Sequence, residues 1–144
     1  MNLKICSIIC AIVIFFISAN CDAAISQESV SNIKSALEVT AGYEKPIIGG
    51  NVEQAEKLYA EYKSIYNNLQ QACGSAGYTE EYNCLMAAET IVNLRCFVLM
   101  DYIIAMDAQK NNRVGQYNEM VATMYKDWAD EKYLRQQFYD EYGM

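Results

Sequence analysis

The side chains that could do acid–base chemistry in this sequence are carboxyl groups in its most apolar stretch outside the N-terminus. Glu89 precedes that stretch and Asp101 lies inside it, so burial would raise the pKa of either group. On one helix the two would be about 18 Å apart, which is too far for paired catalytic carboxyl groups to flank one bond. We therefore expect no catalytic pair here.

The sequence contains no histidine. This absence removes the usual general base near neutral pH, the Ser-His and Cys-His nucleophiles, and the histidine ligands of zinc and di-iron sites. The chain also has neither a glycine-rich phosphate loop followed by Lys-Ser or Lys-Thr nor the spaced aspartates of a calcium-binding EF-hand loop. We therefore expect a protein that is not an enzyme and that holds no metal or cofactor.

Arg95 places a cation in the same apolar stretch. A guanidinium group there either pairs with an acidic residue of a neighbouring helix or faces a site that binds an anion. The sequence favours the ion pair and leaves the anion site open.

Six cysteines are present. Two of them belong to an N-terminal leader-like segment, which leaves four candidates for disulfide bonds: Cys21, Cys73, Cys84 and Cys96. Cys84 and Cys96 cannot bond to each other on one helix, since about 18 Å separates them and a disulfide tolerates about 7 Å between Cα atoms. Cys73 and Cys84 flank a predicted turn that contains two glycines. We expect at least one disulfide, with Cys73–Cys84 favoured and Cys73–Cys96 the main alternative.

Two sets of side chains could bind a partner. Thioether and aromatic side chains of the C-terminal half could line a cavity for a small hydrophobic ligand, or could fill the core: Phe97, Met100, Met106, Met120, Met124 and Trp128. Tyrosines on one broad face of a predicted helix could contact another protein, or could lie at half-buried positions of a bundle: Tyr59, Tyr62 and Tyr66. Both pairs of alternatives remain open.

Residues 1–23 have the order of regions found in a secretory signal peptide. A lysine precedes an uncharged apolar run, and small residues follow it. Cleavage after Ala19 or after Ala23 satisfies the preference for small residues, and only the first leaves Cys21 in the mature chain. An uncleaved membrane anchor is the alternative. We expect a protein secreted to the cell exterior, or to the periplasm of a bacterium, with residues 24–144 as one domain without stable membrane insertion.

The chain is acidic, with a net charge of −7, and a leader of residues 1–23 removes one charge of each sign. Such a chain repels phosphate backbones and anionic lipid surfaces. The composition therefore argues against nucleic-acid binding and against electrostatic binding to membranes.

Apolar residues recur at steps of three and four after the leader, which predicts helices over 25–42, 51–73 and 79–112 and another from Tyr117 onward. The long segment 79–112 should be the central helix. Residues 43–50 contain the only proline and form the clearest predicted linker. The apolar stripe of the last helix shifts near Asp130, which predicts a bend or a separate fifth helix. Together these patterns predict an all-α bundle of four to five helices, stapled by a disulfide.

These expectations favour a secreted, non-enzymatic interaction protein, such as an inhibitor, an immunity-type protein or a host-directed factor, that acts on another protein through a helical surface. The alternative hypothesis is a carrier of a small hydrophobic ligand held in a methionine-rich helical cavity.

Overall fold

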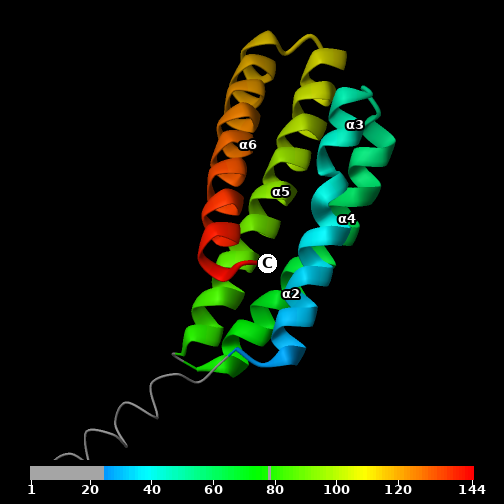
Figure 1. Ribbon diagram of the computed structural model, residues 1–144. Coiled ribbons are helices and arrows are strands. Elements are labelled where there is room, and N and C mark those ends of the chain that lie inside the picture. Colours follow the sequence, from blue (N-terminus) through cyan, green and yellow to red (C-terminus); the bar gives the residue numbers. More distant parts are fainter. Residues whose placement is uncertain (1–24, 78) are drawn as a thin grey trace, which may run out of the picture.

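The computed structural model describes residues 25–77 and 79–144, and every regular element within them is helical (Figure 1). The elements are α2 (Gln27–Val39), the 3-10 helix η1 (Thr40–Tyr43), α3 (Glu44–Ile48), α4 (Val52–Ala76), α5 (Glu80–Lys110) and α6 (Val114–Tyr142). The prediction of a small all-α bundle is therefore confirmed. The predicted leader, residues 1–23 with Cys21, lies outside the described residues.

The long helices α4, α5 and α6 run side by side in alternating directions and are joined by short turns, while α2, η1 and α3 form a further arm along the bundle (Figure 1). α5 is the central element, because it packs against α2, α4 and α6. Its buried residues point in several directions around the helix, as an enclosed helix requires. Neither α5 nor any other helix of the described part is long and apolar enough to cross a membrane.

The predicted linker over residues 43–50 is wrong, because η1 and α3 occupy most of it and leave a turn at Gly49 and Gly50. Pro46 lies in the first turn of α3. The N–H groups of a first turn have no acceptor inside the helix, so the N–H that proline lacks costs nothing there. Gly50 has φ 65°, and the Asn51 N–H donates to the carbonyl of Pro46. The first arm is thus helical for most of its length.

The predicted turn after Cys73 begins later than expected. α4 continues through Gly74 to Ala76, and the chain turns at Gly77, whose φ is 66°. Glycine is tolerated near the end of a helix, and alanine is a strong helix former. Cys73 therefore lies within α4 rather than at the corner between two helices.

The predicted disulfide staple is wrong for the cysteines that the structure describes. These residues are free thiols: Cys73, Cys84 and Cys96. The favoured pairing, Cys73–Cys84, depended on a corner at Cys73 that α4 does not make, and the alternative, Cys73–Cys96, is not formed either. Cys84 and Cys96 are instead buried in the apolar core, where desolvation raises the pKa of each thiol to about 11. The bundle is held by packing in this region.

α6 is one continuous helix, which excludes a separate fifth helix after Asp130. Its apolar stripe shifts because Glu131 faces the core and is 0% exposed. There its carboxylate accepts a hydrogen bond from Arg95 of α5. A buried ion pair, rather than a break in the helix, explains the change in pattern.

The core consists of two apolar clusters along the bundle. The first contains buried residues of α2, α4, α5 and α6: Ile33, Ala36, Leu37, Leu69, Cys84, Leu85, Ala88, Ile91, Val92 and Phe138. The second contains Tyr43, Ala55, Tyr62, Cys96, Val98, Leu99, Tyr102 and Met124. On α5 and α6, the buried charged residues Arg95 and Glu131 lie between the positions that belong to the two clusters. A polar layer therefore divides the core.

Candidate functional site

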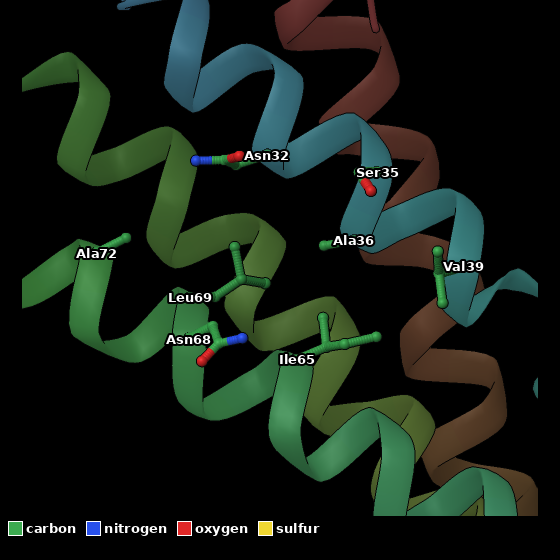
Figure 2. A pocket seen from close by; sticks show the side chains of 8 residues that line it. All are labelled: Asn32, Ser35, Ala36, Val39, Ile65, Asn68, Leu69 and Ala72. Atoms are coloured by element: carbon green, nitrogen blue, oxygen red, sulfur yellow. The ribbon is translucent and has the colours of Figure 1, made fainter.

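A groove of about 450 Å³ runs between α2 and α4 (Figure 2). Each helix contributes half of its lining residues: Asn32, Ser35, Ala36, Val39, Ile65, Asn68, Leu69 and Ala72. In each helix the four positions follow the spacing i, i+3, i+4, i+7, which places them on one face. The groove is thus formed by two helix faces turned toward each other.

Two of the four α2 side chains on this face, Ser35 and Ala36, are short and fill little of the space between the helices. α4 presents Ile65 and Leu69, whereas α2 presents Ser35 and Ala36 (Figure 2). The larger Ile33 of α2 is buried in the core instead. The backbone of α2 lies closer to α5 than to α4, although Ala36 and Leu69 belong to one apolar cluster. The apolar face of α4 is therefore only partly covered by α2.

The lining of the groove is uncharged, although the chain has a net charge of −7. Lys34 and Glu38 of α2 line a separate hollow near the end of α6. The side chains of Asn32, Ser35 and Asn68 offer donors and acceptors, and no hydrogen bond between described residues uses them. The groove can therefore hold an uncharged, largely apolar molecule, and its lining supplies no general acid or base.

Arg95 lies in the polar layer and is 1% exposed. Its Nε donates to Glu131 Oε1 at 2.8 Å, and its Nη1 donates to the Leu37 carbonyl at 2.8 Å and to the Thr40 hydroxyl at 2.6 Å. Leu37 belongs to the last turn of α2, where the helix dipole favours a cation. Of the two possibilities for Arg95, the ion pair with a neighbouring helix is therefore the correct one.

Glu131 is surrounded by donors from three elements. Besides the Arg95 bond, Glu131 Oε2 accepts from the Tyr43 hydroxyl at 2.9 Å, and Oε1 accepts from Arg135 Nε at 3.1 Å. Burial and the nearby Glu131 charge raise the pKa of Tyr43 well above its usual range, so its hydroxyl remains a donor. These bonds fix the position of α6 relative to α5 and η1.

Asp101 is 5% exposed, and within the described residues its Oδ2 atom has no hydrogen-bond partner. Burial, and to a smaller extent the nearby Asp127 of α6, raises the pKa of Asp101 to about 6. Glu89 also lies on α5 and is partly buried. α5 holds these two carboxyl groups about 18 Å apart along its axis, so the structure does not bring them together.

The six residues predicted to line a ligand cavity do not line the groove. Met124 is buried in the second apolar cluster, and Met106 and Trp128 pack against it. Trp128 Nε1 also donates to Glu44 Oε1 of α3 at 2.7 Å. Phe97 is 39% exposed, so it lies at the surface. The remaining two residues are partly buried: Met100 and Met120.

The three tyrosines predicted to form an interaction face differ in how far they are exposed to solvent. Tyr62 is 1% exposed and belongs to the core, which removes it from any surface. Tyr59 and Tyr66 are partly buried. The Tyr59 hydroxyl lies 3.9 Å from Met100 Sδ, and Lys63 Nζ lies 4.2 Å from the centre of the Tyr66 ring. Only Tyr59 and Tyr66 remain accessible in part.

Sequence reasoning missed the groove, although a signal for it exists. The residues of α2 at positions 32, 35, 36 and 39 repeat the spacing of those of α4 at 65, 68, 69 and 72. Three of the α4 positions, Ile65, Leu69 and Ala72, belong to the apolar steps that predict the helix over 51–73. The small and polar residues at the matching α2 positions indicate that the cover is incomplete.

The fold and the groove define an all-α bundle with an open, uncharged cleft between two of its helices. Comparisons of the chain with protein-family models, with curated proteins and with solved structures give no match.

Proposed function

We propose that this chain is a secreted, non-enzymatic binding protein that acts through a helical surface, and that this surface is the groove between α2 and α4. The observation that carries the proposal is the pair of facing stripes, with Ile65 and Leu69 on α4 opposite Ser35 and Ala36 on α2. An apolar stripe on a helix is stable when another apolar surface covers it. Ala36 and Leu69 are already buried, so a bound molecule would mainly cover Ile65 and Ala72, which are partly buried, and Val39, which is exposed.

The size and lining of the groove support this proposal. Its volume of about 450 Å³ falls in the range of roughly 300–1,000 Å³ that is usual for ligand pockets. Such pockets combine apolar walls with a few polar groups that orient the ligand. Five apolar and three uncharged polar residues line this groove in the same way.

Two tryptophan substitutions on α4 test the groove. Asn68→Trp would fill it, whereas Asn67→Trp places the same ring at a neighbouring position that does not line it. Both asparagines are exposed, so neither substitution disturbs the core. Nile red, an uncharged dye that brightens in apolar sites, should bind the wild type and the Asn67→Trp variant similarly, and the Asn68→Trp variant at least tenfold more weakly. Equal binding by all three proteins, or no binding by the wild type, contradicts the proposal.

Secretion is tested separately by the N-terminus of the protein recovered outside expressing cells. Mass spectrometry should find a chain that begins at Asn20 or at Ala24, since cleavage after Ala19 or Ala23 fits the small-residue rule. A full-length chain that stays with the cells contradicts this part of the proposal.

A second candidate function, contact with another protein, is favoured by exposed aromatic residues on α6. Tyr125 is 61% exposed, and its ring stacks on Trp128 with a centroid distance of 6.2 Å. Aromatic residues of this kind are enriched where proteins meet. A photocrosslinking p-benzoylphenylalanine in place of Tyr125 should capture a partner that the same group in place of Glu119, an exposed position on another face of α6, does not. Equal capture at both positions excludes this face.

A further inference from the structure

We infer that the groove between α2 and α4 takes a small, uncharged amphiphile: an apolar chain of about ten carbons that carries one hydrogen-bonding head group. The inference rests on the proposed function, since it names the ligand class of the same groove. It is carried by three properties of the groove, which are the nature of its apolar wall, the absence of charge from its lining, and its length.

The apolar wall selects an apolar chain. Ile65 and Leu69 of α4 point toward the groove between the two helices, and Ala36 of α2 faces them (Figure 2). Val39 stands at the end of the α2 face and is 49% exposed. Leu69 and Ala36 are already buried, so the apolar surface that a ligand removes from water belongs mainly to Ile65 and Val39. A flexible alkyl chain can follow the space between two helix faces.

The polar residues select an uncharged head group. Asn32, Ser35 and Asn68 lie among the apolar residues of the lining, and their side chains can both donate and accept hydrogen bonds. They match a hydroxyl, carbonyl or amide group. A carboxylate or an ammonium group would meet no opposite charge in the lining, and taking a charge out of water without a partner is costly. The charged Lys34 and Glu38 lie at a different hollow of α2.

The length of the groove favours a small molecule over a helix of another protein. Its lining spans eight residues along each helix, and the seven steps between the first and the last cover about 10 Å. A partner helix would be covered over only about two turns, and a stable protein interface needs roughly 1,000 Å² or more of buried surface. An extended chain of about ten carbons, with C–C bonds of ~1.5 Å, matches the length of the groove.

Three probes with the same ten-carbon chain and different head groups test this inference. They are 1-decanol, decanoate and decyltrimethylammonium, each titrated at pH 7.4 into isotope-labelled protein while the backbone amide resonances are followed by NMR. We expect 1-decanol to shift the resonances of the groove residues with a Kd at least tenfold lower than that of either charged probe. An equal or stronger shift of the same resonances by a charged probe overturns the inference while the proposed function stands.

A charge placed in the groove should reverse the selectivity. Asn68→Lys adds a cation to the lining, so we expect it to strengthen decanoate binding at least tenfold and to weaken decyltrimethylammonium binding. Asn67→Lys adds the same charge to the chain outside the lining and should change decanoate binding less than threefold. Equal effects of the two lysines mean that the head group does not lie at Asn68, which overturns the head-group assignment.

Failure of the inference and failure of the proposed function give different results. If none of the three probes shifts the groove resonances, the ligand class is wrong. The proposed function fails as well if Nile red does not bind the wild type, or if it binds the wild type, the Asn68→Trp variant and the Asn67→Trp variant equally. A dye that distinguishes these variants, together with probes that do not bind, leaves a groove that binds a ligand of another class.

Discussion

Arg95 and Glu131 are buried charges that compensate each other, with side chains 2% and 0% exposed. Glu131→Gln keeps the shape of the side chain and removes its charge, which leaves the guanidinium group of Arg95 buried without a counter-charge. Breaking a buried pair in this way costs about 3–5 kcal/mol. We expect the free energy of unfolding, measured by urea denaturation at pH 7, to fall by about 3 kcal/mol.

An exposed pair on the same helix provides the control for this substitution. Lys126 Nζ lies 2.7 Å from Asp130 Oδ2, and both side chains are at least half exposed. Exposed pairs at this spacing contribute only about 0.3–0.5 kcal/mol, so Asp130→Asn should change the stability by less than about 1 kcal/mol. If Glu131→Gln and Asp130→Asn lowered the free energy of unfolding by similar amounts, the buried Arg95–Glu131 pair would contribute no more to stability than the exposed pair.

Asp101 makes the stability depend on pH in the direction opposite to that of a salt-bridged aspartate. Its pKa is about 6 in the folded chain, against an ordinary value of 3.8. The folded state therefore binds more protons than the unfolded state between these values, and stability falls as the pH rises through this window. The shift of about two pKa units corresponds to roughly 3 kcal/mol, which is present below pH 4 and lost above pH 6.

Asp101→Asn should remove this dependence, because an amide resembles the protonated acid and cannot ionise. We expect the variant to be more stable than the wild type by about 2–3 kcal/mol at pH 7.5 and similar to it at pH 4, as measured by urea denaturation at both pH values. Asp140→Asn, at an exposed position of α6, should leave the difference between the two pH values unchanged. A variant that differs from the wild type by the same amount at both pH values would rule out this role for Asp101.

At the scale of the elements, two glycines near the end of α4 require opposite backbone conformations. Gly74 is helical, and a Cβ atom there would meet nothing within 4 Å. Gly77 has φ 66° and ψ −170°, a region that residues with a side chain rarely adopt. Gly74→Ala should therefore raise the stability by up to about 1 kcal/mol, and Gly77→Ala should lower it by about 1–3 kcal/mol.

Thermal unfolding distinguishes the two glycine variants by the sign of the shift. We expect the Tm to rise by a few degrees for Gly74→Ala and to fall by a similar or larger amount for Gly77→Ala. If both substitutions lower the Tm, α4 ends before Gly74, as the sequence alone suggested.

The sequence predicts the elements of this bundle well where apolar periodicity is long, as in α4 and α5. It predicts them poorly where a residue type is compatible with both a helix and a turn or break. Pro46 indicated a linker, yet it fits the first turn of a helix. Gly74 indicated a turn, yet it lies inside α4. The shift of the apolar stripe near Asp130 indicated a bend or a separate helix, but it arises from Glu131, whose partner Arg95 lies 36 residues away in sequence. No local pattern contains that pairing.

At the scale of the whole molecule, the candidate site depends on how far apart two helices pack. The apolar stripe of α4, which includes Ile65 and Leu69, could be recognised from its spacing. Whether α2 covers that stripe depends on which face of α2 is turned toward α5. Ile33 is buried in the core, whereas Ser35 lines the groove. The same difficulty led to tyrosines being expected on one interaction face, although Tyr62 is in the core. An apolar stripe on a helix indicates that this face is buried in the folded protein, but it does not indicate which element packs against it.

The position of α2 predicts how the whole bundle should respond to a ligand. α2 packs closely on α5, while hollows of about 450 and 260 Å³ lie between it and the neighbouring helices α4 and α6. Its ends are held by a hydrogen bond from Ser26 Oγ to Glu81 Oε1 at 2.6 Å and by the bond from Arg95 to the Leu37 carbonyl. Local opening is easiest where few apolar contacts hold an element. Amide hydrogen exchange should therefore be faster in α2 than in the middle of α5.

A ligand between α2 and α4 contacts both helices only while α2 is in place, so its binding should oppose the opening of α2. At a ligand concentration of 100 Kd, this linkage is worth about 2.7 kcal/mol, which slows exchange through that opening by roughly 100-fold. Hydrogen–deuterium exchange with and without 1-decanol should show this protection in α2 and much less in the middle of α5. Glu81→Gln weakens the anchor at Ser26 and should speed exchange in α2, whereas Glu80→Gln, at an exposed neighbouring position, should not. Protection spread evenly over all helices would instead indicate that the ligand binds outside the groove and stabilises the bundle as a whole.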